Sequence, residues 1–570
     1  MSAQKIITDH LDLWTGAVTH KSSRGRGANG KIELTGIKKL RELILELAVR
    51  GKLVEQDSND EPASVLLERI AEEKARLVKE GKTKKPKKLP EITEEEEPFE
   101  LPVGWTWARL GNISQINPRN IADDKIIASF IPMPLITTSF HGEHEQETRS
   151  WGEIKKGYTH FADGDIAIAK ITPCFENSKA AVFRNLESGI GAGTTELHVA
   201  RPYEGTLNQL FILLCLKSPR FLINGESKMT GSAGQKRVPK DFFAGEPLPF
   251  PPLAEQNRIV EKVDELMALC DRLEQQVGDQ LEAHEVLVDT LLDALTRSAD
   301  ASEVAENWAR IAEHFDTLFN TEASIDKLKQ TILQLAVMGR LVEQDPNDEP
   351  ASELLERIAE EKALLVKEGK IKKPKKLPEI ADNEEPFPIS NKWRWVRFGE
   401  ITFNRDSERI PLSVNERSRR KGEYDYYGAS GVIDKIDEFL FEKPLLLIGE
   451  DGANLINRST PIAFIARGKY WVNNHAHVID GISEDFLKYL SLYINAISLE
   501  PYVTGTAQPK MNQAKMNSII VGLPPMQEQQ RLIEKYDAFM ALCDQLKARL
   551  NETGETRVQL AGAVVEQAVG

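Results

Sequence analysis

The sequence is poor in cysteine and contains no long apolar run. Its four cysteines, among 570 residues, form no CxxC pair and no zinc-ligand spacing, which excludes a disulfide scaffold and a zinc-finger fold. They are Cys174, Cys215, Cys270 and Cys543. No stretch of about 18 apolar residues occurs, so we expect no transmembrane helix, and the polar start MSAQKIITDH does not resemble a signal peptide. These absences predict a cytoplasmic protein with reduced thiols.

The motifs of several enzyme classes are also missing. No GxxxxGK[ST] loop for ATP is present. The PPL at Pro251 and the PPM at Pro524 lack the preceding Asn or Asp and the following aromatic residue of an adenine-methylating loop. The GIGAG run at residues 189–193 is predicted to be a turn, and HGEHE at His141 is not an HExxH zinc site. We therefore expect a protein that is not an enzyme, with no catalytic residue and no cofactor or metal bound by this chain.

A long internal repeat dominates the chain. Residues 37–92 return as residues 325–380 at an offset of 288 without a gap, and roughly 45 of the 56 aligned pairs are identical. A second pair of similar segments follows at an offset of 273, PPLAEQNRIVEKVDELMALCDRLE from Pro251 and PPMQEQQRLIEKYDAFMALCDQLK from Pro524. The change of offset means that the stretches between the repeats differ in length by 15 residues. The chain is therefore predicted to consist of two like frames that carry two unlike inserts.

Each frame includes a long predicted helix. Between Glu255 and about Arg297 there is no proline and the apolar residues recur with a helical period, so about 43 residues at 1.5 Å each give a helix of about 65 Å. Its counterpart runs from Glu528 toward the C-terminus. A single apolar stripe needs a partner, and we expect the two long helices to pack antiparallel about a pseudo-twofold axis. The predicted seam consists of Val263, Leu266, Cys270, Leu273, Val277, Leu287 and Leu291, with Gln280, His284 and Ala294 in the same frame, and of Tyr536, Phe539, Cys543, Leu546 and Leu550.

The inserts are predicted to be mixed α/β domains. Short β-type runs follow Asp165 and Ala180 in the first, and Lys443 in the second. Both inserts end alike, with TGSAGQKRVPK from Thr230 and TGTAQPKMNQAK from Thr504, which indicates diverged copies of one domain. The predicted division is a helical region with the first repeat (1–104), the first insert domain (105–250), a long helix (251–298), a helical region with the second repeat (299–392), the second insert domain (393–523) and a last long helix (524–570).

These features together resemble the specificity subunit of type I restriction–modification systems. The resemblance covers nearly the whole chain and is carried by PPLAEQNRIV at Pro251, PPMQEQQRLI at Pro524, FADGDIAIAKITPCFENSKAA from Phe161 and YGASGVIDKIDEFLFEKPLLLIGEDGANL from Tyr427. The long block from residue 37 resembles the subgroup called type IB. The resemblance implies a mixed α/β fold, with two target recognition domains separated by long antiparallel coiled-coil helices.

The same resemblance implies a function and partners. Each insert is expected to read one half of a split, asymmetric DNA site, with the helices fixing the spacer between the halves. The expected partners are double-stranded DNA, two modification (methyltransferase) subunits and restriction subunits that translocate on DNA and cut it. Those subunits are expected to use S-adenosylmethionine, ATP and Mg, whereas this chain binds none of them and no membrane.

Two functions of other classes remain as alternatives. A self-contained methyltransferase or nuclease would need the motifs that are missing, and a purely structural coiled-coil protein would not need two large divergent inserts. A neighbouring reading frame for a methyltransferase with an Asn-Pro-Pro-Phe-type loop would separate these from the first interpretation.

Candidate DNA contacts are polar or basic residues of the inserts, because bidentate side chains read base edges and basic or hydroxyl groups hold phosphates. The alternative for each is an ordinary loop residue. The candidates are Lys170, Thr172, Lys179, Thr194, Thr195, Gln235, Lys236, Arg237 and Lys240 in the first insert, and Arg417, Arg419, Arg420, Ser430, Asn473, Asn474, His475, Gln508, Lys510, Asn512 and Lys515 in the second. Residues 21–31 are either a flexible arm on DNA or on a partner, or disordered chain. The KKPKK linkers are either a nucleic-acid or localisation patch or a solvated linker.

Charge separates the inserts from the frames. The chain has 73 basic and 88 acidic residues, a net charge of −15, which argues against a protein that binds DNA by bulk positive charge. Residues 105–250 carry a net charge of +1 and residues 393–523 a net charge of 0. The frames and ends therefore carry −16, and we expect the near-neutral inserts to bind DNA weakly by themselves.

Overall fold

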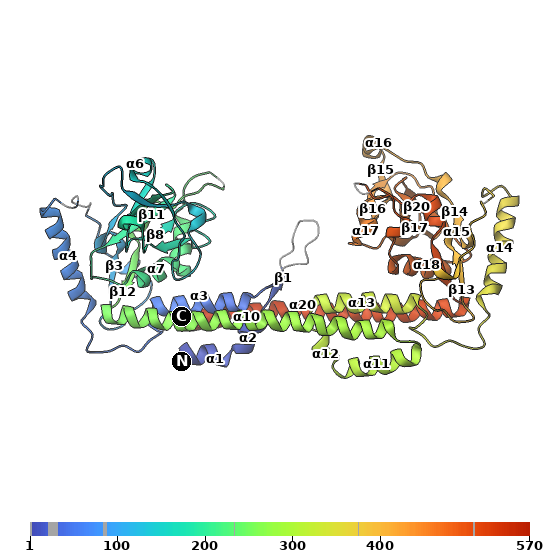
Figure 1. The fold of residues 1–570 in the computed structure, drawn as a ribbon, viewed down its shortest axis with the longest axis horizontal. Coiled ribbons are helices and arrows are strands. Elements are labelled where there is room, and N and C mark those ends of the chain that lie inside the picture. The colour runs from blue at the N-terminus through green and yellow to red at the C-terminus, as the bar shows by residue number, and fades with distance from the viewer. Residues whose placement is uncertain are drawn as a thin grey trace. The chain divides into compact units, whose positions relative to one another are not determined.

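The computed structural model describes residues 3–20, 32–81, 83, 88–232, 234–373, 375–505 and 508–569. The chain forms two compact units, one of Met1–Asp279 with Thr553–Gly570 and the other of Gln280–Glu552 (Figure 1). Each unit contains one copy of the repeated frame and one insert domain, and the fold is mixed α/β as predicted.

The frame of the first unit is a packed set of three helices. Helix α3 (Thr35–Val49) packs with the first part of α10 (Leu253–Arg297) and the last part of α20 (Met526–Val569). The shorter helices α1 (Ala3–Asp9) and α2 (Leu11–Gly16) pack against α3. The shared core includes Leu40, Leu43 and Leu47 of α3, Ile259, Val263 and Leu266 of α10, and Val558, Val564 and Val565 of α20.

The second unit repeats this arrangement with the other ends of the long helices. Helix α13 (Glu322–Val337) packs with the last part of α10 and the first part of α20, beside α11 (Ala301–Glu313) and α12 (Phe315–Leu318). The first unit holds the start of α10 and the end of α20, and the second holds the end of α10 and the start of α20, so the two helices are antiparallel as predicted. The prediction of a two-helix seam was incomplete, because α3 and α13 each add a third helix.

The third helix also changes the seam of α10. Val263, Leu266 and Cys270 are buried as predicted, but Leu287 is 49% exposed and the adjacent Val288 is only 1% exposed. The assignment of Leu287 to the seam was therefore wrong. A strict seven-residue repeat drifts by about 20° per heptad on a straight helix, and the buried positions beyond residue 280 are those that face α13. These positions are Val288, Leu292 and Leu295.

The remaining seam positions lie closer to the prediction. Cys543 is buried in the core of the second unit, and the other four positions of α20 pack against that core as partly buried side chains. They are Tyr536, Phe539, Leu546 and Leu550. On α10, Leu273 and Leu291 likewise pack against a core, while Val277 is half-buried and Ala294 is exposed. His284 donates a hydrogen bond from Nε2 to the Thr317 carbonyl, at 3.2 Å, and Gln280 is exposed.

Two glycines make the same sharp turn at the ends of α3 and α13. Gly51 and Gly339 have φ values of +65° and +70°, a conformation that a residue with Cβ adopts only at a cost. A Cβ at Gly51 would lie 2.9 Å from the Trp105 ring, and one at Gly339 would lie 2.6 Å from the Trp393 ring. Each turn therefore places the tryptophan that opens an insert domain directly against the end of a frame helix.

The first insert domain is built on two four-stranded sheets. One has the order β4-β11-β8-β9 and the other the order β6-β5-β10-β7, and the pair β3 and β12 closes the domain at its two chain ends. Helix α7 packs against β8 and β9 of the first sheet, and both α7 and α8 contact α3. The bounds are β3 Thr106–Arg109, α5 Leu110–Ile113, β4 Ser114–Ile116, β5 Ile127–Ile131, β6 Glu147–Ser150, α6 Trp151–Ile154, β7 Thr159–Ala162, β8 Ile166–Ala169, β9 Ala180–Val182, β10 Ile190–Gly193, β11 Leu197–Pro202, α7 Gln209–Lys217, α8 Pro219–Ser227, α9 Lys240–Gly245 and β12 Pro247–Phe250, preceded by β1 Thr19–His20, β2 Ile32–Glu33 and α4 Ala63–Lys79 in the frame.

The second insert domain has an equivalent first sheet and closing pair, but its second sheet has three strands and no counterpart of β7. Its first sheet has the order β14-β20-β17-β18, its second the order β16-β15-β19, and the pair β13 and β21 closes it. The inserts are therefore diverged copies of one domain, as their similar tails predicted. The bounds are β13 Arg394–Arg397, α15 Phe398–Ile401, β14 Phe403–Asn404, α16 Val414–Arg419, β15 Lys421–Gly428, β16 Gly431–Ile436, β17 Leu445–Gly449, α17 Asn454–Asn457, β18 Ala463–Ala466, β19 Tyr470–Val472, β20 Ala476–Asp480, α18 Glu484–Ala496, α19 Gln513–Asn517 and β21 Ile520–Leu523, preceded by α14 Ala351–Lys367 in the frame.

The glycine cluster of the first insert differs from its prediction. Only Gly189 lies outside a strand, at the end of a short 3₁₀ helix (Glu187–Gly189), and the rest of the GIGAG run is strand β10, which pairs with β5 and β7. Its small residues let the strand pass close to the Phe161 ring. The run was misjudged because glycine is depleted in strands generally and is used where another group approaches the backbone closely.

Candidate nucleic-acid interface

Candidate residues of the first insert domain gather where three segments meet. The segment after β8 donates backbone hydrogen bonds from Lys170 N to the Glu196 carbonyl (2.9 Å) and from Thr172 N to the Lys236 carbonyl (3.0 Å), and the Lys170 carbonyl accepts from Val238 N (2.8 Å). Ile171 and Arg237 form an isolated β-bridge. These contacts hold together the segment after β8, the segment before β11 and the segment of residues 234–237, where Arg237 also bridges Thr230. We call this meeting point the first strand-end cluster. It brings together Lys170, Thr172, Thr194, Thr195, Gln235, Lys236 and Arg237.

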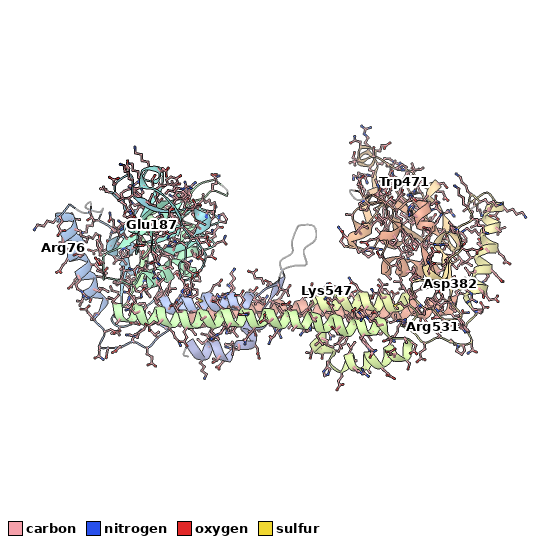
Figure 2. The ribbon with its side chains drawn as sticks, in the orientation of Figure 1. Arg76, Glu187, Asp382, Trp471, Arg531 and Lys547 are labelled. Atoms are coloured by element: carbon pink, nitrogen blue, oxygen red, sulfur yellow. The ribbon has the colours of Figure 1, made fainter. Side chains whose placement is uncertain are left out.

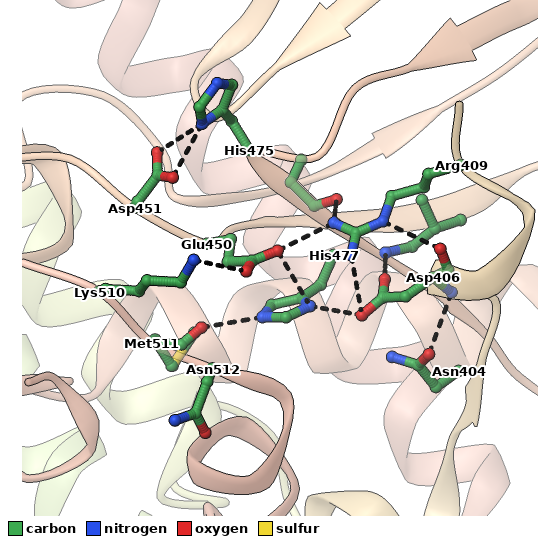
Figure 3. Close-up of polar contacts among 12 residues, drawn as sticks. Asn404, Asp406, Arg409, Glu450, Asp451, His475, His477, Lys510, Met511 and Asn512 are labelled. Carbon is green, nitrogen blue, oxygen red and sulfur yellow. Dashed lines mark hydrogen bonds and ion pairs between the residues drawn. The ribbon is translucent and has the colours of Figure 1, made fainter. Parts of the chain in front are cut away.

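The second insert domain has the same meeting point (Figure 3). Glu450 N donates to the His475 carbonyl and Met511 N donates to the Glu450 carbonyl, both at 2.8 Å. Asp451 and Lys510 form the isolated β-bridge. We call this the second strand-end cluster. It brings together the predicted residues His475, Gln508, Lys510 and Asn512.

A buried histidine anchors each cluster in the same way. His198 of β11 donates from Nε2 to the Val238 carbonyl, and His477 of β20 donates from Nε2 to the Met511 carbonyl, both at 2.9 Å. Val238 and Met511 correspond at the offset of 273 that also relates the end segments of the inserts. The backbone of the two clusters is therefore equivalent, and the exposed side chains on it differ.

Charges in the first strand-end cluster are paired on the surface and neutral beneath it. Arg237 makes a bidentate ion pair with Glu196, at 2.8 and 2.9 Å, and this hydrogen bonding lowers the pKa of Glu196. Burial lowers the pKa of His198 to about 4, with Lys170 and Lys240 acting in the same direction. His198 Nδ1 is buried without a hydrogen-bond partner among the described residues, so this imidazole is neutral at pH 7.

The second strand-end cluster contains a buried ion pair instead. His477 Nδ1 donates to Asp406 Oδ2 at 2.6 Å, and the other Asp406 oxygen accepts from Val478 N at 2.8 Å. Burial alone would lower the pKa of His477, but the hydrogen bond and charge of Asp406 outweigh it and raise this pKa.

A carboxylate between these groups and the surface binds two cations. Glu450 pairs with Arg409 at 2.9 Å and with Lys510 at 3.2 Å, as Figure 3 shows. His475 and Asp451 form an exposed pair beside them, at 2.8 Å. The predicted contacts Lys510 and His475 are therefore held by carboxylates that the sequence analysis did not include.

Two other predicted residues of the first insert lie close to its cluster. Lys179 follows the loop after β8 and donates to the Met133 carbonyl at 3.2 Å. Lys240 is exposed at the start of α9. Thr194 Oγ1 accepts from Glu196 N at 3.2 Å, and Thr195 and Gln235 are exposed.

Several predicted residues of the second insert have structural partners or lie elsewhere. Asn473 is 5% exposed and its Oδ1 accepts from His475 N at 2.8 Å, so its assignment to base contact was wrong. Asn512 caps α19 through Lys515 N at 3.0 Å. Asn474 and Lys515 are exposed near the cluster, whereas Ser430 is exposed in the β15–β16 turn.

The three arginines near α16 differ from one another. Arg420 pairs with Asp437 and Glu438 at 2.9 and 2.6 Å and lies over the Trp471 ring. Arg417 lies over the Tyr426 ring, with Cζ 4.9 Å from its centroid. Arg419 is exposed. Arg417 and Arg420 therefore have partners within the domain, whereas Arg419 has the exposure that a backbone contact with DNA requires.

The two buried histidines, His198 and His477, and the carboxylates of both clusters were not predicted from the sequence. A signal was present for the histidines, because LHVA and AHVI stand at corresponding places in the two inserts. No comparable signal exists for Glu196 and Asp406, which contact residues 41 and 71 positions away. Among the described residues, no group of three His, Cys, Asp or Glu side chains is arranged to hold a metal ion. Residues 21–31 and most of the first KKPKK linker lie outside the described residues.

Chemically, the exposed part of each cluster offers amide, ammonium and carboxylate groups on a backbone fixed by buried hydrogen bonds. Such groups at loop positions suit the donor and acceptor patterns of base edges. The matching clusters on two copies of one domain thus place different exposed side chains on one repeated backbone arrangement.

Comparison with known proteins decides the family. Residues 102–283 and 391–553 match the type I restriction modification DNA specificity domain. The chain belongs to this family. The chain is 52% identical over 596 residues to the type I restriction enzyme EcoEI specificity subunit of Escherichia coli. It is 51% identical over 591 residues to the EcoAI specificity subunit of the same species. Both matches cover 100% of each chain. These matches support the assignment of the chain to the type IB-like subgroup. They also support its prediction as a non-catalytic part of a restriction–modification complex.

Solved structures give more distant matches. A structure titled "Structural basis underlying complex assembly and conformational transition of the type I R-M system" matches 83% of this specificity subunit and 99% of that chain, at 17% identity and a TM-score of 0.47. The HsdS subunit from Thermoanaerobacter tengcongensis matches 83% of this chain and 98% of its own, at 18% identity and a TM-score of 0.44. Among the described residues of the specificity subunit, no helix combines the length and apolar character needed to cross a bilayer.

The motif that carried the resemblance joins frame to insert in both units. Glu255 and Glu528 are buried and accept the indole N–H of Trp105 and Trp393, at 2.9 and 3.1 Å. Burial raises the pKa of Glu528 to about 7. Three residues beyond each glutamate, Arg258 and Arg531 pair with Asp60 and Asp348 at 2.6 Å, and Arg531 is labelled in Figure 2. The repeated motif thus anchors each insert domain to its frame.

Proposed function

We propose that each insert domain reads one half of a bipartite, asymmetric DNA site, and that the long helices fix the spacer between the halves. The observation that supports this proposal is the pair of strand-end clusters, which share a backbone arrangement and differ in their exposed side chains. One domain copied twice and then varied at its exposed groups is suited to two unlike half-sites.

The helices support the spacer part of the proposal by their length. Helix α10 has 45 residues and α20 has 44, so at 1.5 Å per residue each is about 67 Å long. Protein readers on DNA are spaced by about 34–36 Å per helical turn. Rigid helices of this length are a suitable ruler for two half-sites.

The partners and cofactors of the complex belong to the same proposal. The chain would act in the cytoplasm with double-stranded DNA, two modification subunits and the restriction subunits. The modification subunits would use S-adenosylmethionine to methylate a flipped adenine, and the restriction subunits would use ATP and Mg. This chain would contribute recognition and assembly, and its near-neutral insert domains would depend on the partners for much of the contact with DNA phosphates.

Exchange of one insert domain tests the reading of half-sites. Residues 105–250 are replaced by the corresponding residues of a relative, and the methylated sites of a host with the whole complex are sequenced. We expect one half of the site to change and the other half to stay. Loss or change of both halves contradicts independent reading, and methylation or cleavage by the purified chain alone favours a self-contained enzyme.

A helix insertion tests the spacer separately. Seven residues added near Gln280, which is exposed, lengthen α10 by about 10 Å. We expect an altered spacer or loss of methylation with both half-sites unchanged in sequence. Full activity at the original spacer overturns the ruler and leaves the half-site proposal intact.

A further inference from the structure

One exposed histidine of the second strand-end cluster has a fixed ring and a free nitrogen. His475 Nδ1 lies 3.0 and 2.8 Å from the two carboxylate oxygens of Asp451. The side chain of His475 is 52% exposed and that of Asp451 is 32% exposed. Within the described residues the other ring nitrogen, Nε2, makes no hydrogen bond, and Figure 3 shows it directed away from Asp451. The pair therefore offers one imidazole nitrogen to a ligand.

The backbone on both sides of this pair is fixed by hydrogen bonds. His475 N donates to Asn473 Oδ1 at 2.8 Å, and the His475 carbonyl accepts from Glu450 N at 2.8 Å. Asp451 forms a β-bridge with Lys510. Both members of the pair are thus held in place before a ligand binds, so that binding orders few additional groups.

The carboxylate of Asp451 decides which nitrogen of the imidazole carries the proton. An ionised carboxylate only accepts hydrogen bonds, so Nδ1 of His475 is the donor. In the neutral imidazole the second nitrogen is then unprotonated and accepts. The exposed edge of the neutral ring is therefore a hydrogen-bond acceptor.

The other charged groups of this cluster are paired with one another. Glu450 pairs with Arg409 at 2.9 Å and with Lys510 at 3.2 Å. His477 pairs with Asp406 at 2.6 Å. In the part of the chain that the structure describes, Asp451 is thus the one group that orients the His475 ring by a hydrogen bond.

The equivalent place in the first strand-end cluster is occupied differently. Glu196 stands two residues before the buried His198, as His475 stands two residues before His477. Both carboxylate oxygens of Glu196 accept from Arg237, at 2.8 and 2.9 Å. The first domain therefore has an ion pair where the second presents an imidazole edge.

A neutral acceptor at this place selects one kind of group on DNA. In the major groove, adenine N6 and cytosine N4 are amino donors, whereas guanine offers the acceptors N7 and O6 and thymine offers O4. Phosphate oxygens also only accept, so they do not bind an unprotonated Nε2. The chemistry of the pair therefore favours the amino edge of adenine or cytosine.

We infer that His475 is a specificity-determining residue, whose Nε2 accepts a hydrogen bond from the amino group of one adenine or cytosine in the half-site read by the second insert domain. Asp451 is the positioning residue that fixes the required tautomer. This inference rests on the proposed function and deepens it, because it gives one base contact and its chemistry. The contact affects a single position of one half-site.

A double-mutant cycle between protein and DNA tests this contact. The assembled complex, with the wild-type chain or with His475→Ala, is titrated against duplexes that carry its methylated site, at pH 8, which is above the range in which histidine gains its charge. In the half-site of the second domain, each adenine is replaced in turn by purine and each cytosine by pyrimidin-2-one, both of which lack the amino group, and each guanine by 7-deazaguanine, which lacks N7. We expect one amino-group position at which the analogue weakens wild-type binding by about three- to tenfold and weakens the variant no further.

Two further variants separate the tautomer from the presence of a side chain. Asp451→Asn leaves a group that donates as well as accepts, so it should reduce the coupling at the same position although His475 is kept. His141→Ala is the matched control, because it removes another exposed histidine beside an aspartate, with Nδ1 3.5 Å from Asp264 and outside both clusters. It should keep the full coupling, and circular dichroism should show unchanged secondary structure in all three variants.

Each alternative gives a different result. A His475→Ala complex that keeps the whole analogue effect at every position overturns the contact. Coupling to 7-deazaguanine instead of the amino-group analogues overturns the acceptor assignment, and an equal loss on all sequences indicates a phosphate contact and overturns it as well. If His475→Ala relaxes bases in the half-site that exchange of residues 105–250 changes, the independent reading of half-sites in the proposed function fails too.

Discussion

The two insert domains hold equivalent histidines in different charge states. His198 and His477 donate the same hydrogen bond to the same place in the chain, at 2.9 Å in both. Near His198, Asn117 accepts from Val199 N at 2.9 Å, and near His477, Asp406 accepts from Val478 N at 2.8 Å. A neutral amide in one domain thus accepts the backbone hydrogen bond that a carboxylate accepts in the other, and the carboxylate also binds the histidine.

The comparison shows how this fold tolerates change at its recognition surface. The hydrogen bonds that hold the three segments together are repeated in both domains. They join backbone groups and therefore do not depend on the side chains at these positions. Exposed groups can therefore differ, as Glu196 and His475 do, while their positions stay fixed. The frames show the opposite behaviour. Roughly 45 of the 56 aligned residues in 37–92 and 325–380 are identical, so the two frames share their side chains as well as their backbone.

The largest expected effect breaks the joint between frame and insert. Trp393→Ala removes a ring that is 1% exposed and leaves Glu528 without its indole donor, so we expect a loss of about 3–5 kcal/mol in the free energy of unfolding. Trp105 is 8% exposed, and Trp105→Ala should cost toward the lower end of that range. Chemical unfolding combined with hydrogen exchange of each unit measures the two stability losses. A larger loss for Trp105→Ala than for Trp393→Ala contradicts the expectation that the more deeply buried ring contributes more.

A smaller effect separates the two histidines directly. Asp406→Ala removes the partner of a buried, charged imidazole, so we expect a loss of about 3 kcal/mol in the stability of the second insert domain. Asn117→Ala removes a neutral hydrogen bond and should cost about 1 kcal/mol in the first. Pulse proteolysis of the full chain reports each domain through its own fragments. Equal losses would show that the ion pair adds nothing to the second domain.

Acid should affect the two domains in opposite directions. The pKa of His198 is lowered to about 4, against about 6.5 in an unfolded chain, so its contribution to stability is present above pH 6.5 and is lost as the pH falls toward 4. The loss at pH 5.5 is about 1.4 kcal/mol. The pKa of His477 is raised, so its contribution is present below pH 6.5 and is lost as the pH rises through the folded value.

The measurement is the stability of each domain between pH 5 and pH 8. His198→Asn should remove the acid sensitivity of the first domain, and His477→Gln should remove the alkaline loss in the second. Parallel pH profiles for the two domains in the wild type would refute the different charge states.

The smallest effects concern DNA. Gln235 and Gln508 occupy matching exposed positions of the two clusters. Replacing either by Ala should weaken DNA binding by about 1 kcal/mol and relax sequence specificity in one half-site only. Lys515→Ala serves as a phosphate-contact control, because it should weaken binding to all sequences alike and reduce the salt dependence by about one ion. Binding is measured with the assembled complex on sites altered in one half, and a glutamine variant that affects both halves equally breaks the assignment.

The sequence was most informative where structure depends on neighbours along the chain. The offsets of 288 and 273 identified the duplicated frames, and apolar periodicity placed α10 within two residues of its observed start. The same reasoning failed at Leu287, because the face that α13 buries on α10 depends on how three helices meet. It failed at Asn473 for a related reason, since a polar residue before a strand is as often a backbone cap as an exposed contact.

The sequence by itself determined that this protein is a duplicated α/β and helical chain of the type I specificity family. It also determined that the two inserts are copies of one domain and that the frames carry the negative charge. Only the tertiary structure decided which polar groups meet in the strand-end clusters and that one buried histidine is paired with a carboxylate while the other is neutral. It also decided that the two long helices pack with a third helix in each unit, α3 in the first and α13 in the second. Periodicity and repeats record local preferences and ancestry, whereas these features depend on side chains that are tens to hundreds of positions apart and that only folding brings within hydrogen-bonding distance.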